Sequence, residues 1–156
     1  MTRTLLFIAS HLGVLVVGFA LGVYLLPILS APPAPSMADV QASAHGALYH
    51  GEFRRSLPGS DALHWGEGRV TVSASSVTLA GRLAPGPAYR LYLVRGFVED
   101  EAGFRRVKAQ ALAVGDIRTF DNFIVPLPPG AAPQDYDTAV VWCEAFSRFI
   151  TAAKYR

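Results

Sequence analysis

The sequence predicts an all-β domain, an antiparallel β-sandwich or a barrel-like variant, behind one N-terminal transmembrane helix. With 156 residues the chain has room for one membrane segment and one modest domain. An uncharged and mostly apolar run extends from Thr4 to Leu29. After residue 48, glycine and proline recur at short intervals between β-rich runs, which is typical of short antiparallel strands.

The N-terminal run is long enough to be a membrane anchor. As a helix, Thr4 to Leu29 would extend about 39 Å, more than the hydrocarbon core of about 30 Å. A cleaved secretory signal has an apolar region of only about 7–15 residues, and prolines crowd the place where cleavage would fall. We therefore expect residues 1–30 to be an uncleaved, single-pass anchor. Arg3 precedes the run and favours a cytoplasmic N-terminus, which leaves the rest facing the periplasm or cell exterior.

Residues 31–48 connect the anchor to the domain, which is expected to occupy residues 49–156. The stretch from Ala31 to Ser36 is rich in proline and indicates a short, stiff spacer that lifts the domain off the membrane. Residues 36–47 form either a short helix or a loop. Without Arg3, the chain holds 13 Lys or Arg against 12 Asp or Glu, and they are scattered. This pattern does not predict a nucleic-acid partner.

The domain is expected to contain several short strands, at residues 69–73, 77–79, 89–94, 120–127 and 138–143. The last of these, Thr138–Cys143, is apolar on both faces, which predicts that it is covered on both sides. Residues 146–153 fit a final strand or a helical turn equally well. The acidic triplet Glu99-Asp100-Glu101 is interpreted as an exposed hairpin tip.

Cys143 is the one cysteine of the chain, and it ends the last predicted strand. A single thiol cannot close an intramolecular disulfide, so three interpretations stay open: a buried apolar filler, a redox or partner-bonding thiol, or a metal ligand. Reactivity would require a pKa lowered by positive charge, for which Arg148, Arg54, Arg55 or His64 are candidates. The adjacent Glu144 and an apolar surround would act in the opposite direction.

The residue pattern argues against the common redox cofactors, and we expect no cofactor and no metal site. A dithiol shuttle needs two cysteines, and covalent haem needs a Cys-x-x-Cys-His motif. Both methionines, Met1 and Met37, precede the predicted domain and cannot supply a haem ligand within it. No histidine follows Cys143 at the close spacing of a blue-copper site.

The C-terminal third of the domain resembles a known family. Tyr136, an apolar strand ending in Trp142-Cys143, and the phenylalanines Phe146 and Phe149 resemble the closing signature of the DM-thirteen family, also called electron-transfer DM-thirteen. Other parts are similar to the same family: His64 with Gly68 and Val70, Gly86-Pro87 before a strand, and Gly115-Asp116-Ile117 followed by Phe123 and Pro126. Phe123 stands where the family tends to have Tyr. The resemblance covers about residues 49–156.

The resemblance implies a β-rich extracytoplasmic domain with a cysteine suspected of a redox role. Our hypothesis is a membrane-anchored module with an accessory redox or electron-transfer role centred on Cys143, acting with a redox protein partner. Trp142, Phe146, Tyr136 and His64 would support its pocket. The alternative is a non-catalytic binding or scaffold module at the membrane surface, with Cys143 buried as core. A third option is a thiol enzyme such as a peroxide-reacting protein, for which the sequence supplies no expected acid or base. Whether the chain is an enzyme therefore stays open, and the first two hypotheses do not require it.

Overall fold

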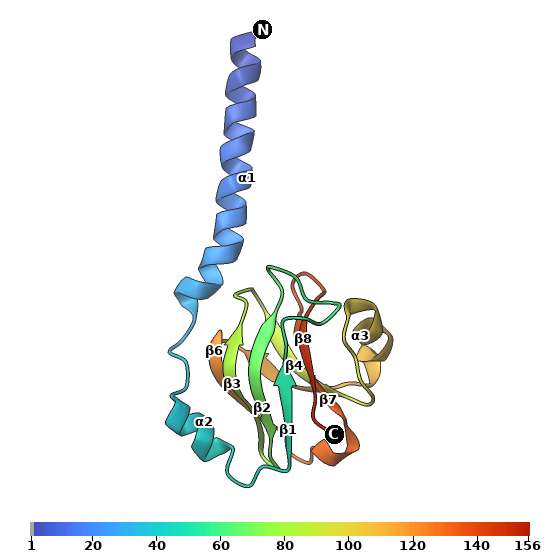
Figure 1. Cartoon of the computed structure of the whole chain (residues 1–156). Helices are drawn as coiled ribbons and strands as arrows, with labels where there is room; N and C mark the ends of the chain where they lie inside the picture. Colours follow the sequence, from blue (N-terminus) through green and yellow to red (C-terminus); the bar gives the residue numbers. More distant parts are fainter. Residues whose placement is uncertain (1) are drawn as a thin grey trace.

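The computed structural model describes residues 2–156, which form a long helix and a β-sandwich (Figure 1). Helix α1 (Thr2–Ser30) extends from one end of the sandwich. It is the one helix of residues 2–156 that is long and apolar enough to cross a membrane. Length and composition alone support this, and an N-terminal signal sequence has the same properties.

The proline-rich segment after α1 runs along the side of the sandwich to the short helix α2 (Met37–Ser43) (Figure 1). A capping box starts α2: the Asp39 N–H donates to Ser36 Oγ at 3.2 Å, and the Ser36 N–H donates to Asp39 Oδ2 at 3.1 Å. Val40 is buried, and α2 packs against the first sheet at strands β3 (Ser76–Leu83) and β6 (Asp121–Pro126). The segment therefore lies on the domain and does not lift it away.

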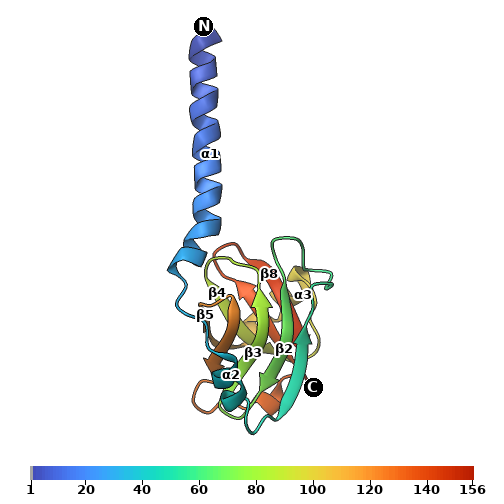
Figure 2. The same cartoon turned by 60° about the vertical axis from the view of Figure 1, so that its left-hand side comes forward.

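Two antiparallel sheets of four strands face each other, which confirms the predicted β-sandwich (Figure 2). The first has the order β1-β2-β3-β6, with β1 at Tyr49–Phe53 and β2 at Gly66–Val72. The second has the order β5-β4-β7-β8, with β5 at Leu112–Ile117, β4 at Tyr89–Val94, β7 at Thr138–Cys143 and β8 at Arg148–Lys154. Short 3-10 turns lie at Lys108–Gln110 and Pro133–Asp135.

The main core lies between the sheets and follows the alternation of each strand. Val70 and Val72 contribute from β2, and Leu91 and Leu93 from β4. A second, smaller core covers the outer face of the second sheet under α3 (Glu101–Val107); its buried members are Tyr92, Val94, Val98, Phe104, Val140, Trp142, Phe149 and Ala152. Strand β7 is buried along its whole length because it contributes to both cores, as predicted.

The interpretation of the acidic triplet as a hairpin tip was wrong. Asp100 is the N-cap of α3, and its Oδ1 accepts a hydrogen bond from the Gly103 N–H at 2.6 Å. Phe104, one turn later, is completely buried in the second core. A helix of seven residues with one buried side chain leaves too little periodicity for the sequence to reveal it.

The undecided segment near the C-terminus is strand β8. Phe149 packs into the second core and Ile150 into the first, which is the alternation of a strand. Ser147, with φ 52°, turns the chain from β7 into β8. The exposed Phe146 lies in this turn and does not belong to the strand.

Candidate functional site

Cys143 ends β7 at the end of the sandwich from which α1 extends. In the second sheet it pairs with Tyr89 of β4 and with Arg148 of β8. Its side chain points into the core between the sheets and is 2% exposed, as its position at the end of a doubly covered strand predicts. Sγ donates a hydrogen bond to the carbonyl oxygen of Pro87 at 3.1 Å. The thiol is therefore held by the turn that precedes β4.

A mostly apolar cavity of about 300 Å³ separates this end of the sandwich from α1. Phe19, Val23 and Tyr24 of α1 line one side of it. Cys143, His64 and Phe146 are among the residues that line the other side. The thiol thus borders on a space between the helix and the domain, although little of it reaches solvent.

Two of the four residues predicted to support the thiol line this cavity, and two do not. His64 and Phe146 share it with Cys143. Trp142 points to the opposite face of the sheet, where its ring centroid lies 4.9 Å from that of Phe104. Tyr136 precedes the start of β7, at the other end of the strand from Cys143. The expectation that Trp142 shapes the pocket fails because successive strand residues face opposite sides.

Burial raises the pKa of the Cys143 thiol above its ordinary value. The backbone N–H groups of Phe146 and Ala145 act against this by favouring the thiolate, and the charge of Glu144 adds to the upward shift. Because the net effect is upward, the neutral thiol is the resting form at neutral pH.

The arginines considered as activating charges are paired with carboxylates. Arg54 lies 3.2 Å from Glu52, and Arg55 lies 2.7 Å from Glu67. Arg148, although it is the strand partner of Cys143, lies 3.1 Å from Glu101. None of these three guanidinium groups lowers the pKa of the thiol.

His64 is held in place by Asp61. Its Nδ1 lies 2.9 Å from each carboxylate oxygen of Asp61, and Oδ1 also accepts the backbone N–H groups of Leu63 and His64 at 2.7 and 2.8 Å. Partial burial acts to raise the pKa of Asp61, but the hydrogen bonds to His64 and Leu63 outweigh it and leave the pKa lowered. The Asp-x-x-His spacing was the signal in the sequence that could have indicated this pair.

A polar cluster that the sequence does not reveal lies on the outer face of the second sheet, around Glu144, the residue that follows Cys143. Lys108 Nζ lies 2.6 Å from Glu144 Oε2, and the Tyr92 hydroxyl donates a hydrogen bond to Glu144 Oε1. Burial and the hydrogen bond to Glu144 raise the pKa of Tyr92 to about 12. The ammonium group of Lys108 also lies 5.3 Å from the ring centroid of Trp142. Tyr92, Lys108 and Glu144 are far apart in the sequence, so no local spacing of residues indicates that they meet.

The described part of the chain, residues 2–156, contains no group of three or more His, Cys, Asp or Glu side chains placed to hold a metal ion. The cavity is lined both by the sheltered thiol of Cys143 and by the imidazole of His64, which Asp61 holds in place.

The family model described as Electron transfer DM13 matches residues 56–155. The matched segment includes His64, Cys143 and Phe146, and it covers all strands of the sandwich except β1. No curated protein and no solved structure gives a significant match. Since the family model matches more than half of the chain, the protein belongs to the Electron transfer DM13 family.

Proposed function

We propose that the protein is a membrane-anchored, extracytoplasmic module with an accessory redox role centred on Cys143. In this proposal α1 is retained as a single-pass anchor, and the sandwich faces the periplasm or cell exterior. The absence of charge from Thr4 to Leu29 and the position of Arg3 before this run support the orientation.

The redox role rests on the position of the Cys143 sulfur. It borders a cavity that also holds His64, whereas Val141 and Ala139, which share its face of β7, are fully enclosed in the core. A cavity beside a thiol provides room for a reacting group, which a purely structural cysteine does not need. The imidazole of His64, which the Asp61 carboxylate holds, lines the same cavity and is the group that we assign to take up the thiol proton.

A single cysteine can take part in thiol–disulfide exchange when a partner protein supplies the disulfide. The thiol of Cys143 gives its proton to His64, and the thiolate attacks one sulfur of a disulfide in the partner. The partner's S–S bond breaks, and a mixed disulfide forms between Cys143 and the partner. The second partner sulfur leaves as a thiolate and takes the proton from His64, so the step needs no other oxidant.

The second candidate function is a binding or scaffold module with Cys143 as part of the core. The burial of the side chain and the raised pKa favour it, because an inert thiol has both properties. In this case the partner would be held by surface contacts, and its capture would not depend on sulfur chemistry.

The test is trapping of a mixed disulfide on the full chain in its host membrane. Acid quenching and alkylation of free thiols preserve a mixed disulfide with a partner. It is detected as a band of higher mass that disappears when a reductant is added. The redox role predicts such a species for the natural protein and none for Cys143→Ala. Partner capture that is equal for both proteins, with no reducible species, would establish the scaffold function instead.

A further inference from the structure

The strands of the sandwich lie below α1, but the loops at the upper end of the sandwich reach the level of the last turns of the helix (Figure 1). Phe19, Val23 and Tyr24 line the same cavity as Leu63 and Phe146. The helix continues for six residues beyond Tyr24, to Ser30. One end of the domain is therefore level with a part of the helix that belongs to the uncharged run (Figure 1).

If α1 is the anchor we propose, the thickness of the hydrocarbon core determines where the turns of α1 beside Leu63 and Phe146 lie relative to the bilayer surface. A span of about 30 Å takes about 20 helical residues. Counted from Thr4, the first residue after the charge of Arg3, this span ends at Val23. Tyr24 follows, and tyrosine is enriched at the boundary between hydrocarbon and headgroups. The boundary on the outer side thus passes through the turns of α1 that face Leu63 and Phe146.

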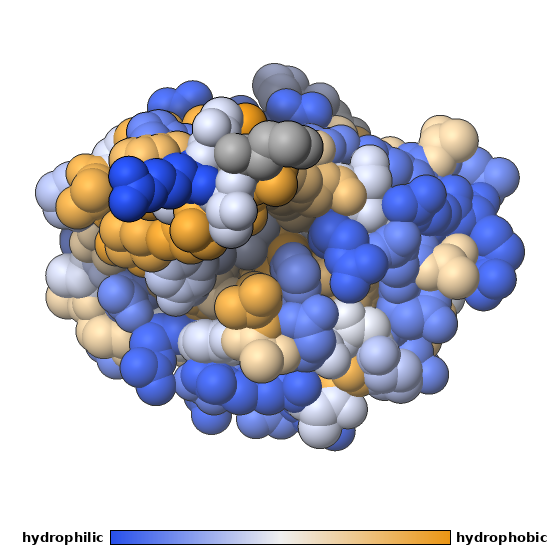
Figure 3. Space-filling view, turned by 90° about the horizontal axis from the view of Figure 1, so that it is seen from above, coloured by the Kyte–Doolittle hydropathy of each residue, from blue (hydrophilic) through white to orange (hydrophobic). Residues whose placement is uncertain are grey.

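The domain presents side chains that suit this boundary. Leu63, in the loop between β1 and β2, is 63% exposed, and Phe146, in the turn between β7 and β8, is 52% exposed. Seen along α1, the apolar helix stands over one side of the domain, and hydrophobic residues interrupt the hydrophilic surface next to it (Figure 3). In water these exposed side chains would cost free energy, whereas among lipids they would not.

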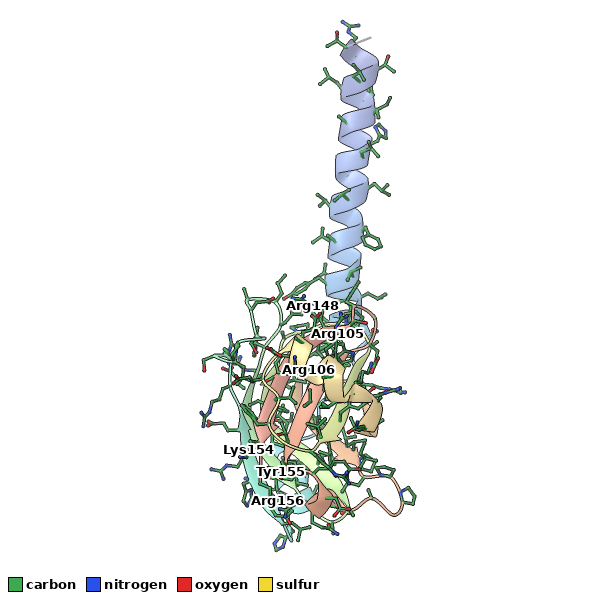
Figure 4. The ribbon with its side chains drawn as sticks, turned by 90° about the vertical axis from the view of Figure 1, so that its right-hand side faces the viewer. Arg105, Arg106, Arg148, Lys154, Tyr155 and Arg156 are labelled. Atoms are coloured by element: carbon green, nitrogen blue, oxygen red, sulfur yellow. The ribbon has the colours of Figure 1, made fainter. Side chains whose placement is uncertain are left out.

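Basic side chains lie around the same end. Arg105, Arg106 and Arg148 lie on the part of the sandwich nearest to α1 (Figure 4). Arg105 donates a hydrogen bond to the Ser147 carbonyl oxygen at 3.1 Å, next to Phe146. Arg105 and Arg148 are each paired with Glu101, at 2.9 and 3.1 Å, so their charges are partly neutralised. The exposed apolar side chains therefore carry the match to the acyl boundary of a phospholipid layer.

We propose that the end of the sandwich that carries Leu63 and Phe146 is seated in the outer phospholipid headgroup layer, so that the cavity beside Cys143 opens toward lipid. This inference rests on the proposed anchoring by α1 but not on the redox role. With this seating, the bilayer surface is part of the environment of the Cys143 thiol. The partner that can reach the thiol is then one that lies in or on the same membrane.

Spin labels on the full chain test the seating in nanodiscs of phosphatidylcholine and phosphatidylglycerol. The background is Cys143→Ala, and single cysteines replace Leu63, Phe146, Leu48 or Leu15. Leu48 is the matched control, since it is 50% exposed but lies before β1, at the end of the sandwich away from α1. Collision with oxygen, which concentrates in lipid, is compared with collision with a water-soluble nickel complex for each label.

We expect labels at Leu63 and Phe146 to favour oxygen over nickel several-fold more than the label at Leu48. The label at Leu15, in the middle of α1, should favour oxygen most. Water-like behaviour at Leu63 and Phe146 with lipid-like behaviour at Leu15 would overturn the seating and leave the anchor intact. Water-like behaviour at Leu15 as well would overturn both the anchor and the seating.

A second measurement leaves Cys143 in place in case its replacement disturbs the fold. Phe146→Trp and Leu48→Trp are compared with the parent protein in nanodiscs with lipids brominated high on the acyl chain. The seating predicts extra fluorescence quenching for Phe146→Trp alone, above that of the native tryptophans. Equal quenching for both variants would contradict it.

Discussion

The Sγ atom of Cys143 lies 3.1 Å from the carbonyl oxygen of Pro87, a contact that joins the end of β7 to the turn before β4. A carbonyl oxygen can only accept a hydrogen bond, so this partner stabilises the thiol and not the thiolate. The contact acts in the same direction as burial, which raises the pKa of the sulfur. Burial and the hydrogen bond to Pro87 therefore both stabilise the neutral thiol of Cys143.

Access to the thiol should depend on Phe146, which lines the cavity and is half exposed. We expect Phe146→Ala to increase the rate at which a small maleimide labels the native protein in detergent by several-fold. Phe97→Ala is the matched control, because Phe97 is 47% exposed and does not line the cavity. Equal labelling rates for both variants would show that Phe146 does not guard the thiol.

The raised pKa of Cys143 predicts how stability depends on pH. In the unfolded chain the thiol ionises near its ordinary pKa of about 8.5, whereas the folded protein keeps it protonated to higher pH. The unfolded state then binds fewer protons, so the free energy of unfolding falls as pH rises through this window. Urea unfolding between about pH 8 and pH 9.5 should show a steeper fall for the natural protein than for Cys143→Ala. Parallel curves would mean that the folded thiol titrates normally.

The second core should be as important for stability as the core between the sheets. Phe104 is completely buried, and its ring centroid lies 4.9 Å from that of Trp142 and 5.2 Å from that of Tyr92. We expect Phe104→Ala to lower the free energy of unfolding by about 3–5 kcal/mol, measured by chemical denaturation. A loss below about 1 kcal/mol would indicate that α3 is not firmly docked on the sheet.

The start of α3 should depend on one side chain. Asp100 Oδ1 accepts the Gly103 N–H at 2.6 Å, so Asp100→Ala leaves that group without its partner. A loss of about 0.5–2 kcal/mol in the free energy of unfolding is expected. Asp100→Asn keeps an acceptor oxygen and should restore most of the stability. If Asn and Ala behave alike, the charge of Asp100, and not its capping bond, is what stabilises the helix.

The parts of the fold that the sequence predicts best are those in which local pattern and burial agree. Thr138–Cys143 is apolar on both faces, and the bounds of β7 match the prediction. Phe149 and Ile150 fit a helix and a strand equally well, because adjacent apolar residues on a strand covered on both faces lose the alternation that identifies it. Only the two cores on either side of β8 decide between them.

The candidate site was predictable in its centre but not in its surroundings. The structure brings Cys143 and His64 to one cavity, whereas alternation along β7 places Trp142 on the other face of the sheet. The contribution of α1 to the cavity could not be predicted, since a run of apolar residues carries no information on which domain surface it meets. The pairing of Glu144 with Lys108 likewise depends on the way α3 folds over the sheet.

The spacer has a consequence for how the protein meets other molecules. Asn122 binds it to the first sheet: its Nδ2 donates to the Pro35 carbonyl oxygen at 3.2 Å, and its Oδ1 accepts the Gly81 N–H at 3.0 Å. Because Val40 is also buried a few residues later, the spacer is fixed to the domain from Pro35 onward. If α1 is the anchor we propose, only the short link before Pro35 separates the membrane from the domain. The domain would then stay close to the lipid, and its encounters with membrane-bound partners would occur in two dimensions.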